Sequence, residues 1–270
     1  MHSFRIKTYL TLLLASFFSA AAVSGMPKDN IKKKNLVPSA AEPDRMVVMT
    51  QKSKDLPSQQ PANHPASANY SVREGIDVSH YQGTIDWEQV ARAGDVGYVF
   101  VKASEGSTIQ DDTYNYNVSE ARRAGLLVGS YHFFRANTNL DDQLANFTSL
   151  AKRDQQDLLP IVDVEHTNGV GDSELVDRLH QFLEKVTKYY GRRPILYTFV
   201  NFYNRYLSGQ GFDHYPLMVA FYRDAQPELY DGRKYIIWQY SSRGRKDGIH
   251  GRVDQSVLMD GFSISDLLMQ

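Results

Sequence analysis

The 270-residue sequence contains no cysteine, so disulfides, cysteine-ligated zinc, iron–sulfur clusters and thiol nucleophiles are excluded. It also lacks an excess of charge, because 30 Lys and Arg side chains balance 31 Asp and Glu side chains. Without an overall positive field we expect no nucleic-acid partner. The G-x-S-x-G, G-x-x-x-x-G-K-[ST] and G-x-G-x-x-G motifs are missing as well, which argues against serine-hydrolase and phosphate-binding chemistry.

The N-terminus has the features of an export signal. Arg5 and Lys7 precede an apolar run over residues 9–18, and small residues follow over 19–25. The run is shorter than the ~20 residues of a membrane-spanning helix, so we predict a cleavable signal peptide over residues 1–25. The protein is therefore expected to be exported, to the periplasm, the cell wall or the medium, with no stable membrane insertion after cleavage.

Residues 26–69 hold six of the ten prolines and no Phe, Tyr or Trp. Such a segment buries too little apolar surface to offset its ordering entropy, so we predict a disordered linker containing Pro and Lys over residues 26–72. Its run Lys32, Lys33 and Lys34 is compatible with an anionic membrane or wall polymer, but we favour a solvated tether. The remaining residues, 73–270, are expected to form one domain.

This domain alternates β-branched and aromatic runs with amphipathic stretches, which is typical of an α/β fold. About eight strands are expected, over residues 75–79, 97–103, 126–134, 159–165, 194–199, 217–222, 235–240 and 252–258. Eight strands in roughly 198 residues are too compact for a full (β/α)8 barrel of ~250 residues. We therefore predict an irregular (β/α) barrel with reduced helix content.

Three segments are expected to be helical. Two open on capping-box patterns, Asp86 with Gln89 and Thr138 with Asp141, and run towards residues 93 and 152. The third begins at Ser173, shows apolar residues at helical spacing and stops at Gly191.

Four acidic residues stand at the ends of apolar runs. Asp163 and Glu165 are two residues apart in one predicted strand, hence on one face and about 6 to 7 Å apart. Asp77 lies in the first predicted strand and Asp254 in the last, and closing a barrel makes these strands neighbours. Because reactive groups lie at the carboxyl ends of parallel barrel strands, we expect the four carboxyls to meet in one cavity.

Carboxyls that converge in a partly dry cavity cannot all stay ionised, so one of them is expected to hold a proton near neutral pH. A protonated acid beside ionised ones suits cleavage of a glycosidic bond, because the acid protonates the leaving oxygen and the anions stabilise an oxocarbenium-like transition state. The alternative is that these residues only cap helices or form salt bridges.

Aromatic residues make up 12% of the chain, and sugar rings stack on flat apolar faces. Six of them lie near predicted strand ends and are candidate substrate-binding residues: Tyr81, Phe133, Tyr197, Tyr222, Trp238 and Tyr240. The alternative for each is a place in the core or at the rim.

Several short blocks also resemble glycoside hydrolase family 25, the Ch-type lysozymes that act as N-acetylmuramidases. The opening strand does so with GIDVSHYQG at 75–83 and IDW at 85–87. Further blocks follow in the family's order: FVKASEG at 100–106, YHF at 131–133, DVE at 163–165, LYT at 196–198, WQY at 238–240 and GRVD at 251–254. The resemblance spans about residues 73–258.

The resemblance implies a barrel of reduced helix content that cleaves the β-1,4 bond between N-acetylmuramic acid and N-acetylglucosamine in peptidoglycan. It also implies Glu165 as proton donor, with Asp163, Asp77 and Asp254 stabilising charge or orienting the N-acetyl group. Two positions depart from the family's pattern, Met218 where Trp is frequent and Ser256 where Asn is frequent. Neither departure removes an acid, so they bear on sugar stacking rather than on catalysis.

Two other functions stay open from the sequence. A metal-dependent polysaccharide deacetylase would need closely spaced ligands, but the histidines form no H-x-H, H-x-x-H or H-x-x-x-H pair, so we expect neither metal nor cofactor. A catalytically inactive peptidoglycan-binding barrel would keep the fold without needing four acids. In each case the expected partner is the glycan strand, and nothing in the sequence requires more than a monomer.

Overall fold

The computed structural model describes residue 68 and residues 70–269. The expected signal peptide and nearly all of the expected linker lie outside the described residues, and both stay predictions.

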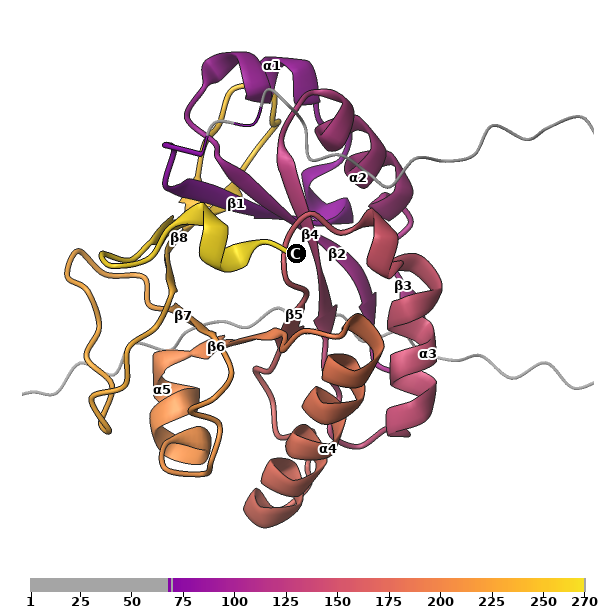
Figure 1. The fold of residues 1–270 in the computed structure, drawn as a ribbon, viewed down its shortest axis with the longest axis vertical. Helices are drawn as coiled ribbons and strands as arrows, with labels where there is room; N and C mark the ends of the chain where they lie inside the picture. Colours follow the sequence, from indigo (N-terminus) through magenta and orange to yellow (C-terminus); the bar gives the residue numbers. More distant parts are fainter. Residues whose placement is uncertain (1–67, 69, 270) are drawn as a thin grey trace, which may run out of the picture. The chain divides into compact units, whose positions relative to one another are not determined.

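Eight strands close into a barrel in the order β1-β9-β8-β7-β6-β5-β4-β2, and β2 pairs back onto β1 (Figure 1). The strands are β1 (Glu74–Val78), β2 (Tyr98–Glu105), β4 (Leu127–Phe133), β5 (Ile161–Asp163), β6 (Ile195–Phe199), β7 (Leu217–Ala220), β8 (Ile237–Gly244) and β9 (Val253–Leu258). A two-residue strand, β3 (Ile109–Gln110), folds back on β2. Each barrel strand overlaps a predicted segment, so the prediction of an irregular eight-stranded barrel is confirmed.

One part of the expectation was wrong: the barrel is mixed rather than all parallel. β9 runs antiparallel to both β1 and β8, whereas the other neighbouring barrel strands pair in parallel. Only residues 245–252 separate β8 from β9, and a parallel return needs a crossover of a dozen or more residues. Asp254 therefore lies near the amino end of its strand, yet at the same end of the barrel as the carboxyl ends of the parallel strands.

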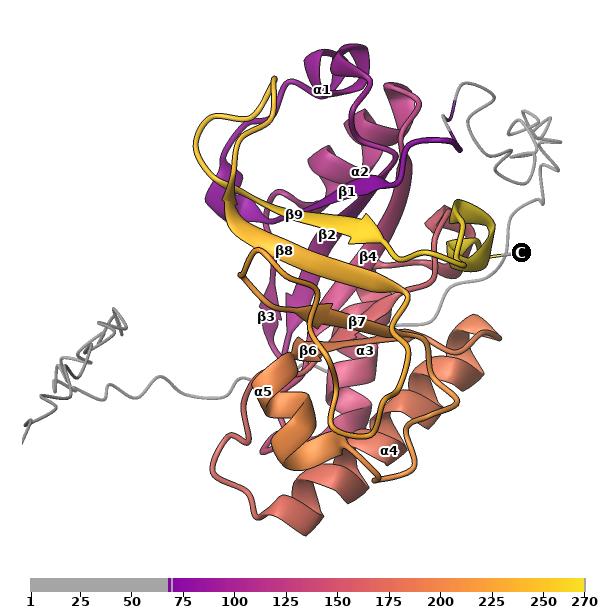
Figure 2. The ribbon, with the colours of Figure 1, turned by 90° about the vertical axis from the view of Figure 1, so that its left-hand side faces the viewer.

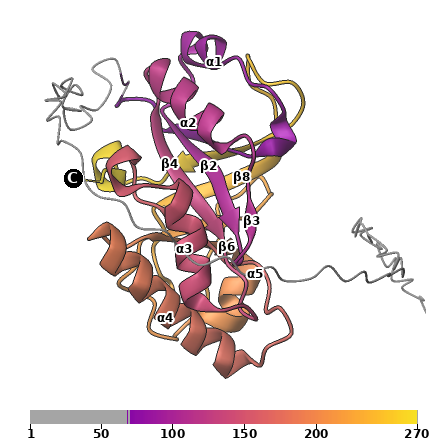
Figure 3. The same ribbon diagram turned by 90° about the vertical axis from the view of Figure 1, so that its right-hand side faces the viewer.

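Helices cover the barrel unevenly, which confirms the reduced helix content. They are α1 (Trp87–Ala93), α2 (Tyr114–Arg123), α3 (Leu140–Leu150), α4 (Asp172–Tyr190) and α5 (Val200–Phe202), with the short turns η1 (His80–Gln82), η2 (Arg153–Gln155), η3 (Tyr203–Leu207) and η4 (Ile264–Leu267). In Figure 3, α2 and α3 lie along the side formed by β2 and β4. The connection between β7 and β8 contains no helix. None of the helices in the described residues is long and apolar enough to cross a membrane.

The helix ends follow the expected capping chemistry, with one correction. Asp86 caps the start of α1, because its carboxylate accepts a hydrogen bond from the backbone N–H of Gln89 at 2.9 Å. The cap of α3 is Asn139 rather than Thr138, since Asn139 accepts from the N–H of Asp141 at 2.9 Å. Thr138 instead donates its hydroxyl to the carbonyl of Arg135 at 3.2 Å.

The chain's last residues close one end of the barrel (Figure 2). Ile264 and Leu267 of η4 are buried against the apolar side chains inside the barrel. The backbone holds them there, because the N–H of Leu159 donates to the carbonyl of Leu267 at 2.7 Å. The opposite end, where the parallel strands finish, holds a cavity lined by described residues.

Candidate active site

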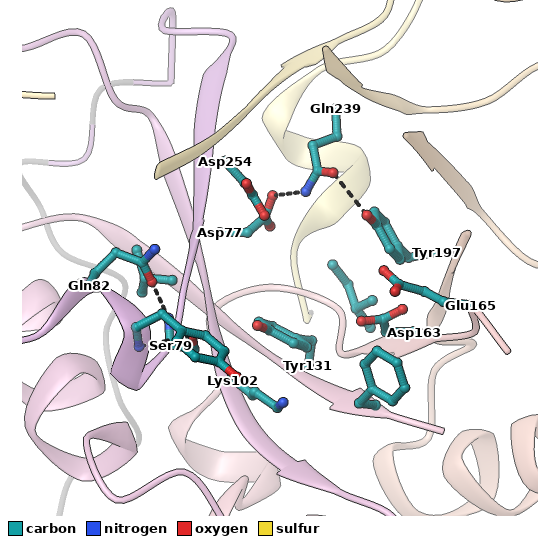
Figure 4. A pocket seen from close by; sticks show the side chains of 14 residues that line it. Asp77, Ser79, Gln82, Lys102, Tyr131, Asp163, Glu165, Tyr197, Gln239 and Asp254 are labelled. Atoms are coloured by element: carbon teal, nitrogen blue, oxygen red, sulfur yellow. Dashed lines mark hydrogen bonds between the residues drawn. The ribbon is translucent and has the colours of Figure 1, made fainter. Parts of the chain in front are cut away.

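The open end of the barrel contains a cavity of about 320 Å³, which we call the acidic cavity. Its lining includes all four predicted acids, and Figure 4 shows their carboxyls turned towards the same space. The lining residues are Asp77, Val78, Ser79, Tyr81, Gln82, Lys102, Tyr131, Phe133, Ile161, Asp163, Glu165, Tyr197, Gln239 and Asp254.

Asp163 and Glu165 enter the cavity from β5 and the residues directly after it. The chain stays paired beyond the strand, because the N–H of Val164 donates to the carbonyl of Tyr197 at 2.9 Å. Val164 itself is fully buried in the outer core, as the two-residue alternation requires. The expected common face of Asp163 and Glu165 is therefore present in the structure (Figure 4).

Burial controls the protonation of this pair. Loss of water raises the pKa of Asp163 well above its usual range, and the negative charge of Glu165 raises it further. One carboxyl oxygen of Asp163, Oδ1, is buried and has no hydrogen-bond partner in residues 70–269. Burial and the charge of Asp254 raise the pKa of Glu165 to about 7, against the opposing charges of Lys102 and Arg135.

Asp77 and Asp254 face each other across the β1–β9 pairing, in which they are direct partners. Burial raises the pKa of Asp77 to about 8, an effect that a hydrogen bond from Gln239 opposes and the charge of Asp254 reinforces. Burial alone raises the pKa of Asp254 to about 6. Because such closely placed carboxyls titrate together, the cluster shares at least one proton near neutral pH.

Gln239, for which the sequence predicts no role, connects three walls of the cavity. Its side-chain N–H donates to Asp77 at 2.9 Å, and its carbonyl oxygen accepts from the hydroxyls of Tyr197 and Tyr222, each at 2.8 Å. This network fixes the orientation of the Asp77 carboxyl. The signal was present in the sequence, since a glutamine interrupts the apolar run before it in the predicted strand 235–240.

Because Gln239 faces the barrel interior, its neighbours Trp238 and Tyr240 must face outward. Trp238 donates its indole N–H to the carbonyl of Phe221 at 2.9 Å, and Tyr240 donates its hydroxyl to Glu74 at 2.6 Å. Neither lines the cavity. Both aromatics therefore lie outside the cavity, because the strand turns Gln239 rather than its neighbours towards the barrel interior, and their binding of substrate stays a prediction.

The other four predicted aromatics lie in or beside the cavity. Phe133 and Tyr197 form part of its wall, and Tyr81 stands at its rim with 81% of its surface exposed. Tyr222 is 42% exposed and reaches the cavity through its hydrogen bond to Gln239. A flat ring is thus available at the rim and on the walls.

A pair of cationic side chains, which the sequence did not predict, flanks the acids. Lys102 lines the cavity and donates to Glu105 at 2.9 Å, and Arg135 pairs with the same carboxylate. Lys102 Nζ and the Arg135 guanidinium lie 5.5 and 4.7 Å from the centre of the Phe133 ring. One carboxylate therefore serves two cations, which leaves positive charge beside Asp163 and Glu165.

A metal site would need several ligands in one place. Over residues 70–269 no group of three or more His, Asp and Glu side chains is positioned to hold a metal ion. This part of the chain thus offers no set of metal ligands of the kind that a metal-dependent deacetylase needs.

Known proteins resemble this chain in sequence and in fold. The model of glycosyl hydrolases family 25 matches residues 76–249. The chain is 38% identical over 194 residues to the uncharacterized protein YegX of Escherichia coli K12, covering 70% of each chain. It is 30% identical to Lysozyme M1 of Streptomyces globisporus, covering 70% of this chain and 68% of that one. The bacterial lysozyme from Streptomyces coelicolor has a TM-score of 0.67 at 30% identity, covering 74% of this chain and 96% of that one. The chain therefore belongs to glycosyl hydrolase family 25.

Proposed function

We propose that this chain cleaves the β-1,4 bond between N-acetylmuramic acid and N-acetylglucosamine in peptidoglycan, with Glu165 as the general acid. Its family makes it a glycoside hydrolase of the lysozyme type and supports peptidoglycan as the substrate class. The observation that carries the residue assignment is the convergence of four carboxyls, all with raised pKa values, in one cavity.

In the proposed reaction Glu165 donates its proton to the glycosidic oxygen as the bond to the muramic acid carbon breaks. Glu165 suits this role because it is less buried than Asp163 and its pKa, about 7, leaves a large protonated fraction at neutral pH. Asp163, Asp77 and Asp254 then stabilise the positive charge that develops on the sugar or orient its N-acetyl group. Water adds to the muramic acid carbon to complete the hydrolysis, and a carboxylate of the cavity takes the proton that this water loses. Gln239 holds Asp77 in place for this task.

We assign the binding of sugar rings to Tyr81, Phe133, Tyr197 and Tyr222. Phe133 and Tyr197 line the cavity, and Tyr81 and Tyr222 expose their rings at its edge. Aromatic faces of this kind bury apolar sugar surface while leaving the hydroxyls free to form hydrogen bonds.

We also propose that residues 1–25 direct export and are removed, that residues 26–72 link this signal to the barrel, and that the protein acts as a monomer outside the cytoplasm. Sequencing the N-terminus of the exported protein tests the first point. A start near residue 26 supports cleavage, whereas a start at Met1 contradicts it.

The Glu165→Gln variant tests the acid. We expect its rate of peptidoglycan cleavage to fall about 10³-fold, because an amide cannot donate the proton. Glu184→Gln, on the exposed side of α4, makes the same chemical change away from the cavity and should keep the parent rate. If Glu165→Gln clears peptidoglycan in a zymogram as the parent does, the assignment of the acid is wrong.

Mass spectrometry of the products separates this function from the two alternatives. Fragments with reducing N-acetylmuramic acid ends support cleavage by a muramidase. Deacetylated but uncut glycans would favour the deacetylase, and unchanged glycans that stay bound would favour the inactive binding barrel.

A further inference from the structure

The end of β8 and the turn that follows it carry a strong local positive charge. Residues 243–252 contain Arg243, Arg245, Lys246 and Arg252 against a single acid, Asp247, although the whole chain has a net charge of -1. The turn adjoins the acidic cavity, because the cavity-lining Asp254 is the second residue of β9 after it.

The three arginines of this segment are available to a ligand. Lys246 is already engaged, because its ammonium pairs with Asp95 at 2.8 Å and its side chain is only 8% exposed. Arg243, Arg245 and Arg252 are exposed, and none forms an ion pair with another residue that the structure describes. We call these three residues the arginine rim.

The backbone that carries the arginine rim is fixed next to the cavity. Gly244, between Arg243 and Arg245, pairs with Val253, the residue before the cavity-lining Asp254. The side-chain N–H of Gln82, a cavity-lining residue, donates to the backbone carbonyl of Arg252 at 3.0 Å. The N–H of Asp86 donates to the carbonyl of Gly248 at 2.9 Å, and Ile249 is buried beside it. Figure 2 shows the turn lying against α1 as a result. The backbone that presents the arginines is therefore anchored at both its tip and its base.

The proposed substrate creates an electrostatic need for such a rim. The muramic acid at the cleaved bond carries a stem peptide with free carboxylates, and the cavity that receives this sugar is itself lined by four acids. Like charges repel in this setting, and the balanced net charge supplies no long-range attraction. Lys102 and Arg135 share the Glu105 carboxylate, and the positive charge that remains lies next to Asp163 and Glu165.

We propose that Arg243, Arg245 and Arg252 bind the carboxylates of the stem peptides on the glycan strand that occupies the acidic cavity. Arginine suits this ligand because its planar guanidinium matches a carboxylate with two parallel hydrogen bonds. The inference rests on the proposed function and deepens it, since it makes peptide-bearing glycan, rather than bare glycan, the preferred substrate.

The test compares one triple variant with a charge-matched control. Arg243→Gln, Arg245→Gln and Arg252→Gln together remove the rim, whereas Lys152→Gln, Lys188→Gln and Lys234→Gln remove the same charge from exposed positions elsewhere. Each protein is assayed on peptidoglycan with its stem peptides and on the same glycan after an amidase has removed them. Thermal unfolding checks that all three proteins fold equally.

On peptide-bearing glycan we expect kcat/KM of the rim variant to fall about five- to ten-fold below that of the parent. The loss should shrink in about 0.5 M salt, which screens exposed charges. On bare glycan the rim variant should match the parent, and the control triple variant should match it on both substrates.

Several outcomes would overturn the inference. Equal losses on both substrates, no loss on either, or the same loss in the control variant would each remove the stem peptide as ligand. If the difference in kcat/KM between the rim variant and the parent disappears after wall teichoic acid has been removed, the ligand of the arginine rim is phosphate. Loss of binding to anionic lipid vesicles with unchanged cleavage would assign it to a membrane.

The parent protein distinguishes this failure from failure of the proposed function. If the parent cuts both substrates and the rim variant equals it, only the role of the arginine rim is refuted. If the parent releases no muramic acid ends from either substrate, the proposed function fails and the inference falls with it.

Discussion

The two ends of the barrel are built from opposite kinds of side chain. The closed end is apolar, with Leu158, Ile264 and Leu267 almost fully buried. The open end buries carboxyls instead, and Asp77 and Asp163 are only 8% and 6% exposed. Burying an aliphatic side chain stabilises the fold by about 1.5–3 kcal/mol, whereas burying a carboxyl opposes ionisation and lowers stability wherever the group must be charged. Stability and reactivity are thus concentrated at different ends of the barrel.

The largest expected change in stability lies at the closed end. Leu267→Ala should lower the free energy of unfolding by about 3 kcal/mol, because it leaves a void among buried apolar side chains. Denaturant titration measures this loss, and the folded variant should keep the parent's specific activity at low temperature. Ile109→Ala, at a 54% exposed position, should cost less than about 0.5 kcal/mol. Equal effects at both positions would contradict the role of the closed end.

At the open end we expect a substitution to raise the free energy of unfolding rather than lower it. The pKa of Glu165 is raised to about 7, so its contribution to stability is full below its ordinary value of 4.5 and is lost as the pH rises through 7. Glu165→Gln should therefore raise the free energy of unfolding by about 2 kcal/mol at pH 8 and change it little at pH 4. Thermal unfolding at both pH values measures this. A variant less stable than the parent at pH 8 would break the contrast between the two ends.

The smallest expected effect is a shift in pH dependence. The charge of Lys102 lowers the pKa of both Asp163 and Glu165, so Lys102→Gln should raise them. If Glu165 must be protonated to act, the alkaline limb of the pH–rate profile moves up by roughly half a unit to one unit. Lys102→Arg keeps the charge and should leave the limb in place. Identical shifts in both variants would point to packing on Phe133 rather than to charge.

The strands and the acids could be predicted because their signals are local. β-branched runs bounded by turn residues mark each barrel strand, and a period of two places Asp163 and Glu165 on one face. The position of Asp254 beside Asp77 followed from barrel closure alone, even though the direction of β9 was predicted incorrectly. Closure requires only that the first and last strands be neighbours, whichever way the last one runs.

The remaining parts of the site depend on contacts between distant segments. Whether Gln239 or its neighbours face inward is fixed by the pairing of β8 with β7 and β9, which a period of two within one strand leaves undetermined. Lys102 gains its place through Glu105 and Arg135, two partners that come together only when β2 and β4 pair. In the same way, no pattern in the sequence around η4 predicts that this segment closes the barrel.

The pairing of β9 with β1 also sets the order in which the site can come into existence during synthesis. The bond from Gln239 to Asp77 spans 162 residues, and Asp254 arrives later still. A nascent chain that ends at β8 contains three of the four acidic residues but lacks the strand that closes the barrel. The edges of β1 and β8 that pair with β9 therefore stay unpaired. Fragments from interrupted translation therefore lack a complete cavity. The site can bind and cleave a glycan only after β9 has been made and has paired with β1 and β8.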